Sequence, residues 1–358
     1  MMWRDSPTVV LLWLLVVLVC TAFGSTNTNT NGFSHNQQQQ HHEPRATTFL
    51  PYERGTHNTT HVFLSKATTL GLEENIDVYL PTEPGAHKMT DHMASHGMAV
   101  VVFWSLTLPL SNLEKLEILK RVFDWTDLNI NRVLHNHGVS EDVTLDLQNI
   151  LMACHSAGCQ LTVDYLKEGC REVKGQALLS PVDGGLDGDG GVAFAITPGT
   201  TLNYATPSLV MPCGLDDVPS VGGFPCGPEH LSNARFYEAL NPTSPRWGIN
   251  ATEFGHGDFL DPAFQHAIEA GNVCGWNHDA TEEELDEYRR YIAGQLVTFH
   301  TALYTDTGDC SEYLPYLQDP GMMLVVTESV YQNPSGGCPM AGCMWSPPPP
   351  TTTTATTN

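Results

Sequence analysis

The chain has 358 residues, enough for one large domain or two small ones. Its 16 Lys and Arg against 40 Asp and Glu give a formal net charge of -24. Without any basic patch or run, this charge excludes nucleic acid and anionic membrane surfaces as expected partners and disfavours a strongly anionic substrate.

The N-terminus has the layout of a signal peptide. Arg4 precedes an apolar run over residues 9–19, and small residues follow. The run is short for a membrane span, so we expect residues 1–24 to be a signal peptide, cleaved near Ala22 or Gly24, or the first half of a bipartite plastid leader. We therefore expect entry into the secretory pathway, a plastid or extracellular destination, and no stable transmembrane span in the mature chain.

Polar segments of low complexity are predicted on both sides of one domain. Residues 25–58 are rich in amide and hydroxyl side chains, and residues 326–358 are rich in Pro and Thr towards their end. Such compositions cannot bury a core, so we expect the second segment to be a disordered tail. The folded domain is predicted over residues 59–325.

Strands and helices alternate within that domain. Continuous apolar runs predict strands covered on both faces, and apolar residues at helical spacing predict amphipathic helices. The predicted strands are 76–80, 99–104, 150–153, 176–179 and 208–211, and the predicted helices are 111–135, 159–166 and 283–303. This alternation predicts an α/β fold with a mostly parallel central sheet flanked by helices.

Nine cysteines remain if the leader and its Cys20 are removed. In an oxidising compartment we expect some of them to pair, and the odd count leaves at least one free. Cys338 and Cys343 are close in sequence, and we interpret them as a local disulfide and not a metal site.

The stretch L-M-A-C-H-S-A-G-C, residues 151–159, presents a candidate nucleophile. A strand that runs directly into a helix can hold Ser156 on a strained turn, provided that the residues two before and two after it are small. Gly158 meets this condition and Cys154 meets it approximately. The backbone N–H of Ala157 would then face a developing oxyanion. The alternative is that Ser156 merely caps the helix.

A nucleophilic serine needs a base and an orienting acid, which follow it in the order acid, then histidine, in α/β-hydrolases. His256, between two glycines in E-F-G-H-G-D-F-L-D (253–261), is the candidate base. The candidate acids are Asp183, after one predicted strand, and Asp216 and Asp217, after the next. Both acid loops could also be simple turns and caps, and Asp258 either supports the histidine or caps its loop.

The order of these segments resembles the chlorophyllase family, α/β-hydrolases that cleave the phytyl ester of chlorophyll. The family's G-H-S-R-G-G is matched by residues 154–159, its D-P-V-x-G by 180–184, and its Y-G-H-M-D-M-L-D by 254–261. The resemblance covers residues from about 62 to 305. It implies an α/β-hydrolase fold with Ser156 as nucleophile and His256 as base.

Two departures from the family pattern bear on activity. The leading Asp of D-P-V-x-G is Ser180 here, so Asp183, three residues on, becomes the preferred acid and Asp217 the reserve. A central strand ending in a His-Gly loop, the source of the second oxyanion donor, is expected before residue 94. Residues 82–93 contain no apolar run that could form it.

We therefore expect a sheet that lacks one central strand. The loss of one oxyanion donor costs about 3 kcal/mol of transition-state stabilisation. Either an exon is missing from the gene model or the chain is a degenerate copy, and we favour the missing exon because the serine and histidine motifs are kept.

The expected function is a carboxylic ester hydrolase that converts chlorophyll to chlorophyllide and phytol through Ser156, Asp183 and His256. The alternatives are a secreted carboxylesterase or lipase with another apolar ester as substrate, and a non-catalytic hydrolase-like protein that binds pigment or lipid. No cofactor is expected, and no metal, because neither C-x-x-C nor H-E-x-x-H spacing occurs.

Overall fold

The structure is a computed structural model, and it describes most of the region between residues 49 and 345 together with an N-terminal strand. The described residues are 13–24, 49–57, 59–64, 75–81, 88–106, 111–170, 173–186, 192–219, 225–260, 262, 265, 274, 276–305, 309–334, 338–339 and 342–345.

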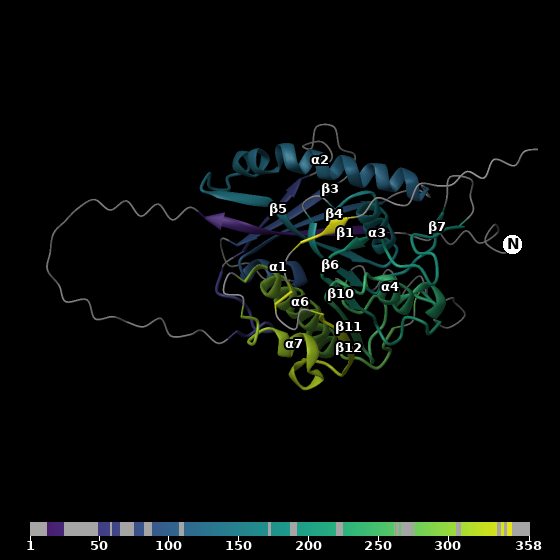
Figure 1. Cartoon of the computed structure of the whole chain (residues 1–358). Coiled ribbons are helices and arrows are strands. Elements are labelled where there is room, and N and C mark those ends of the chain that lie inside the picture. Colours follow the sequence, from purple (N-terminus) through teal and green to yellow (C-terminus); the bar gives the residue numbers. More distant parts are fainter. Residues whose placement is uncertain are drawn as a thin grey trace, which may run out of the picture.

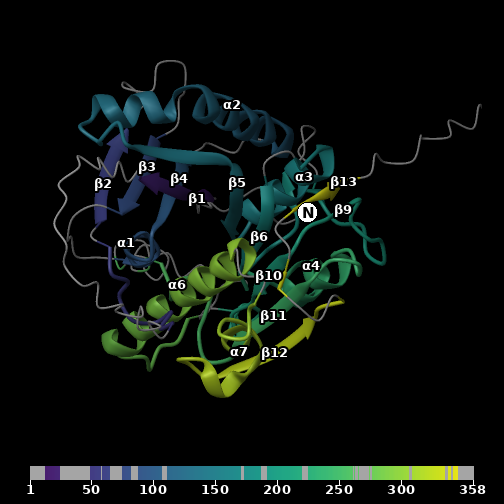
Figure 2. The same cartoon turned by 60° about the vertical axis from the view of Figure 1, so that its left-hand side comes forward.

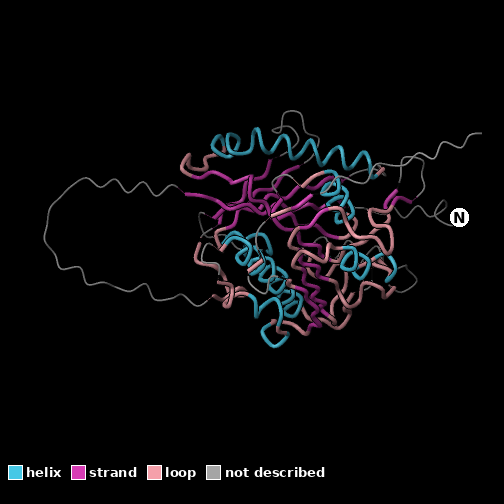
Figure 3. The backbone as a smooth tube through the Cα atoms, in the orientation of Figure 1, coloured by secondary structure: helices cyan, strands magenta, loops and turns pink. Residues whose placement is uncertain are grey.

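A nine-stranded sheet forms the centre of this described part (Figures 1 and 3). In spatial order its strands are β12 (Thr327–Gln332), β11 (Arg246–Ala251), β10 (Ser208–Met211), β6 (Val173–Leu179), β5 (Val143–His155), β1 (Trp13–Gly24), β4 (Met98–Leu106), β3 (Asn75–Pro81) and β2 (Thr59–Leu64). The strands β5, β6, β10 and β11 pair in parallel. β4 runs in the same direction, since β4 and β5 are both antiparallel to β1.

Two short ribbons lie outside this sheet. β7 (Gly185–Leu186) pairs with β8 (Val192–Ala193), and β9 (Tyr204–Ala205) pairs with β13 (Met344–Trp345).

Helices cover both faces of the sheet. They are α1 (Lys88–Ser95), α2 (Asn112–Asn136), α3 (Gly158–Glu168), α4 (Asn233–Ala239), α6 (Glu282–Tyr304) and α7 (Leu314–Gln318), with 3-10 turns η1 (Glu229–Leu231) and η2 (Pro320–Met322). In both views α2 and α3 lie on one face, and α1 and α6 on the other (Figures 1 and 2). The two longest helices each begin with a capping box, Ser111 with Glu114 in α2 and Thr281 with Glu284 in α6.

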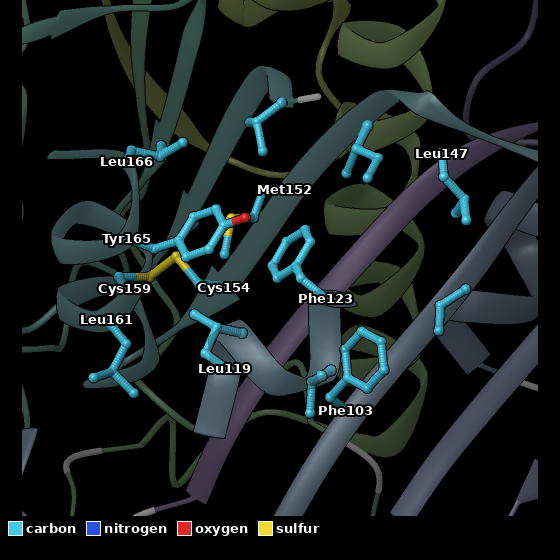
Figure 4. Close-up of a cluster of buried hydrophobic side chains, with 14 of the residues drawn as sticks. Phe103, Leu119, Phe123, Leu147, Met152, Cys154, Cys159, Leu161, Tyr165 and Leu166 are labelled. Atoms are coloured by element: carbon cyan, nitrogen blue, oxygen red, sulfur yellow. A yellow bond between two sulfur atoms is a disulfide. The ribbon is translucent and has the colours of Figure 1, made fainter. Parts of the chain in front are cut away.

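The apolar run of β4 is explained by this layering. Ala99, Val101 and Phe103 pack in the core beneath α2 and α3, whereas Val100 and Val102 pack in the core beneath α6. Side chains alternate across a strand, so a strand covered on both faces must be apolar at every position. Figure 4 shows part of the α2 and α3 side of the core.

The predicted α/β class and the predicted strands and helices are confirmed, and the sheet is parallel in the part formed by β5, β6, β10 and β11. The expected elements differ mainly in their ends: the strand predicted over 150–153 is the C-terminal part of β5, which begins at Val143.

The sheet is not short of a strand, however, because residues from the predicted leader fill the position between β4 and β5. The register places Trp13 opposite Leu106 of β4 and Val16 opposite Cys154 of β5. β1 is antiparallel to both neighbours, so its C-terminal residue, Gly24, lies at the end of the sheet where β5 begins and not at the end where β5 stops. Cleavage of the leader remains a prediction.

The ordered chain also continues past residue 325, where the tail was predicted to begin. β12 pairs with β11 along its whole length, and two disulfides hold the residues beyond it. Cys338 is joined to Cys310 and Cys343 to Cys170, so the expected local disulfide between Cys338 and Cys343 is wrong. Residues 346–358 lie outside the described residues.

None of the described helices combines the length and the apolar character that a membrane crossing requires.

Candidate active site

Ser156 lies on the tight turn between β5 and α3. Its φ is 55°, in the left-handed region that residues with a side chain seldom adopt. The turn is held by the Ser156 N–H, which donates to the carbonyl of Leu179 in the neighbouring strand at 3.1 Å. Ala157 and Gly158 leave room for this geometry, and the half-buried Ser156 side chain remains partly open to solvent.

A disulfide between Cys154 and Cys159 spans this turn. Cys154 is the last but one residue of β5, Cys159 lies in the first turn of α3, and both side chains are buried in the core (Figure 4). The sulfur of Cys154 therefore lies in the core. It replaces the small residue of the motif without crowding the serine, and it ties the strand to the helix.

His256 faces Ser156 from the loop that follows β11. Its Nε2 lies 2.8 Å from Ser156 Oγ, and its side chain is buried. The loop is closed by Asp258, whose Oδ2 accepts hydrogen bonds from the N–H groups of Gly255 at 2.7 Å and Asn277 at 3.1 Å. Asp258 thus caps the loop that presents the histidine.

Asp216, after β10, completes this hydrogen-bonded series. Its Oδ1 lies 2.9 Å from His256 Nδ1. Burial on its own raises the pKa of Asp216, but the hydrogen bond and charge of His256, together with hydrogen bonds from Ser180 and the Cys213 N–H, outweigh burial and hold the pKa below its ordinary value. Asp216 is therefore a carboxylate that accepts the Nδ1–H of the imidazole.

The amino-acid sequence matches the chlorophyllase family over residues 82–332. This chain belongs to the chlorophyllase family. The resemblance stated above is confirmed, and family membership indicates an ester hydrolase with the α/β-hydrolase fold. No curated protein matches the chain.

In this chlorophyllase-family protein the preferred acid from the sequence, Asp183, lies away from the histidine. Its Oδ2 is 2.9 Å from Nε of Arg235, and its carboxylate accepts hydrogen bonds from the N–H groups of Ala195 and Ile196. Burial raises the pKa of Asp183. The reserve acid, Asp217, is exposed. The prediction that Asp183 orients His256 therefore does not agree with the structure, and Asp216 takes that place.

His155 was not singled out by the sequence, although it stands beside the serine. It is buried, its ring lies 4.7 Å from that of His256, and its Nε2 is 3.0 Å from the His256 carbonyl oxygen. Burial and the charge of His256 lower the pKa of His155 to about 3. Its ring is therefore neutral, and its Nε2–H donates to the His256 carbonyl. This hydrogen bond holds the backbone at His256 in place.

The Ala157 N–H is available to an anion. Ala157 is the N-cap of α3, and no hydrogen bond among the described residues uses its N–H. Backbone N–H groups at a helix N-terminus stabilise negative charge. The second oxyanion donor expected of this fold has no counterpart in β1, whose C-terminal end lies at the opposite edge.

Proposed function

We propose that this chain hydrolyses carboxylic esters with Ser156 as nucleophile, His256 as general base and Asp216 as the orienting acid, and that its substrate is the phytyl ester of chlorophyll. The observation that supports the mechanism is the unbroken series of contacts from Ser156 Oγ to His256 Nε2 at 2.8 Å and from His256 Nδ1 to Asp216 Oδ1 at 2.9 Å. Ser156, Asp216 and His256 follow the parallel strands β5, β10 and β11, respectively. β10 and β11 are adjacent, and β6 lies between β10 and β5.

The first step would be acyl transfer to the enzyme. His256 Nε2 takes the proton of Ser156 Oγ as the oxygen attacks the ester carbonyl carbon, and a tetrahedral oxyanion forms. The Ala157 N–H would donate to this oxyanion. Collapse of the intermediate breaks the bond to the alcohol, and phytol leaves with the proton that His256 returns.

The second step would be hydrolysis of the acyl-enzyme. His256 deprotonates water, which attacks the acyl carbon, and Ser156 Oγ leaves with the proton, releasing chlorophyllide. Throughout, the Asp216 carboxylate keeps Nδ1 protonated, so that Nε2 is free to accept, and it stabilises the imidazolium that forms in both steps.

The choice of chlorophyll as substrate is supported by membership of the chlorophyllase family. The formal charge of -24 also suits an ester without a strong negative charge.

The test is to measure two reactions with the purified full chain: hydrolysis of a short p-nitrophenyl ester, and release of chlorophyllide from detergent-dispersed chlorophyll a. Ser156→Ala should lower kcat for both by about 10⁴ or more. Ser140→Ala, at an exposed serine outside the site, is the matched control and should change neither reaction. A fluorophosphonate probe should label the native chain and not Ser156→Ala.

The outcomes separate the possible functions. Hydrolysis of both esters supports the proposal. Hydrolysis of the p-nitrophenyl ester alone would indicate a carboxylesterase or lipase with another substrate. The absence of both reactions and of fluorophosphonate labelling would indicate a non-catalytic protein and would overturn the proposal.

A further inference from the structure

A buried polar group lies next to Asp216, at the end of β6, the strand between β5 and β10. Ser180 Oγ, at the end of β6, is 2.9 Å from Asp216 Oδ1 and 2.7 Å from Asp216 Oδ2. The same hydroxyl is 2.9 Å from Sγ of Cys213, which in turn is 3.0 Å from the hydroxyl oxygen of Tyr288. All four side chains are shielded from solvent.

The backbone at Ser180 is as unusual as that at Ser156. Its φ is 42°, and among the described residues other than glycine these two serines are the ones with positive φ. The Ser180 N–H donates to the carbonyl of Met211 at 2.8 Å, which ties the turn after β6 to the end of β10. The left-handed turn thus directs the Ser180 side chain towards the residues that follow β10, where Asp216 lies.

The direction of the hydrogen bonds in this group follows from which atoms carry protons. Burial raises the pKa of the Cys213 thiol and of the Tyr288 hydroxyl, so both stay protonated and can donate. Ser180 has a single hydroxyl hydrogen, and a carboxylate is a stronger acceptor than a thiol. The Ser180 O–H therefore donates to Asp216, and its oxygen accepts from Cys213.

We propose that Ser180 is a positioning residue of the ester hydrolase: its hydroxyl holds the Asp216 carboxylate in the orientation that accepts the His256 Nδ1–H. This inference rests on the proposed function. Asp216 Oδ1 lies between the two partners, 2.9 Å from Ser180 Oγ and 2.9 Å from His256 Nδ1. Without the hydroxyl, the buried carboxylate loses one of the hydrogen-bond donors that fix its orientation.

Two substitutions remove the hydroxyl. Ser180→Gly suits the positive φ, and Ser180→Ala keeps the β carbon. For both we expect kcat for the p-nitrophenyl ester to fall by about tenfold to a hundredfold, the effect of losing one hydrogen bond to a charged group, with KM unchanged. The matched control is Ser208→Ala, because Ser208 is a buried serine of β10 whose hydroxyl bonds to the Thr206 carbonyl and Gln176. Its kcat should stay at the level of the native chain.

The pH profile distinguishes positioning from a general loss of packing. The Ser180 hydroxyl helps to lower the pKa of Asp216, so its removal makes the carboxylate more basic. The coupled Asp216–His256 pair then binds its proton more tightly, and the acidic limb of the profile of kcat should move to higher pH in Ser180→Gly and Ser180→Ala. A substitution that only loosens packing leaves this limb where it is.

An exchange variant tests the proximity directly. Asp216→Ser alone should lower kcat by about 10⁴. Ser180→Asp combined with Asp216→Ser places the carboxylate at position 180, where aspartate tolerates a positive φ, and the shorter residue at 216 leaves space for it. This double variant should regain at least tenfold in kcat over Asp216→Ser.

The results separate the two proposals. If the native chain has no activity that depends on Ser156, the proposed function fails. If that activity is present but Ser180→Gly and Ser180→Ala keep native kcat and pH profile, the inference about Ser180 is overturned and the proposed function stands. If neither single variant folds, as judged by circular dichroism, an exchange variant no more active than Asp216→Ser overturns the inference.

Discussion

Asp183 Oδ2 lies 2.9 Å from Nε of Arg235, and both side chains are largely or fully buried. The same carboxylate accepts the backbone N–H groups of Ala195 and Ile196. It therefore joins three parts of the chain: the loop after β6, the segment after β8, and α4, which carries Arg235. The pair holds the loops above β6 in place, and its contribution is to stability.

Asp183→Ala should lower the free energy of unfolding by about 3–5 kcal/mol, because it leaves the Arg235 charge buried without its partner. The kcat of the protein that remains folded should be close to native. Asp216→Asn should do the reverse and lower kcat by about 10⁴ with a small change in stability. Urea denaturation and p-nitrophenyl ester hydrolysis measure the two effects. A folded Asp183→Ala protein without activity would return the role of acid to Asp183.

The sequence prediction chose Asp183 as the orienting acid because it relied on a short motif more than on the order of the strands. Residues 180–184, S-P-V-D-G, keep the outline of the family motif, which favoured the aspartate within it. The signal for Asp216 was its position after the next strand, the commoner place for the acid in this fold, but a sequence does not show which loop side chain turns inward. Adjacent Asp216 and Asp217 differ in this: Asp216 is buried and Asp217 is exposed.

Buried histidines should make the fold sensitive to acid. Burial is the main cause that lowers the pKa of His155 to about 3, and of His92 and His300 to about 4. Because these pKa values lie below the value of about 6.5 in the unfolded chain, the unfolded state binds more protons as the pH falls. These histidines therefore do not lower the free energy of unfolding above about pH 6.5, and they lower it increasingly as the pH falls from there towards 4.

His300→Leu tests this, since His300 lies in α6 outside the candidate site. Each such histidine contributes up to about 1.4 kcal/mol of unfolding free energy per pH unit in that interval. The slope of unfolding free energy against pH between 6.5 and 4.5 should therefore decrease by up to this amount in the variant. An unchanged slope in chemical denaturation would show that His300 titrates normally in the folded state.

The cysteines should give one thiol that reacts slowly. The described pairs are Cys154–Cys159, Cys170–Cys343, Cys226–Cys274 and Cys310–Cys338, and the free Cys213 is buried, as the odd count of cysteines predicted. Burial raises the pKa of Cys213 well above its ordinary value, so little thiolate forms. In a full chain that carries Cys20→Ser, dithiobis-nitrobenzoate should detect no thiol before denaturation and one after it. Cys213→Ser should remove that signal, whereas a fast-reacting native thiol would contradict the pairing.

Removal of residues 1–24 should destabilise the sheet severely. β1 pairs with β4 and β5 in the middle of the sheet, and without it each of these strands loses its hydrogen-bond partner on one side. A chain that starts at residue 25 should unfold without cooperativity or aggregate, whereas a control that starts at residue 11 keeps β1 and should melt cooperatively. Equal melting temperatures for the two chains would show that β1 contributes nothing.

Most of the sheet could be predicted from the sequence, but not its central strand. The runs 99–104, 150–153 and 208–211 are apolar because both faces of the sheet are covered, and that pattern identifies a strand on its own. Residues 13–24 are equally apolar, and hydropathy does not distinguish a leader from a buried strand. Only their pairing with Leu106 and Cys154, far along the chain, assigns them to the sheet. β12 was missed because, at the edge of the sheet, most of its side chains are exposed.

β1 is far from its partner strands in the sequence, so it is synthesised well before they are. Synthesis reaches Leu106, the end of β4, about 80 residues after Gly24, which takes roughly 4 to 16 s at about 5–20 residues per second. Throughout that interval the apolar segment has no strand to pair with, and it has the features that export machinery binds. If the predicted leader is recognised for export, we therefore expect slower translation between these two positions to favour its capture over its entry into the sheet.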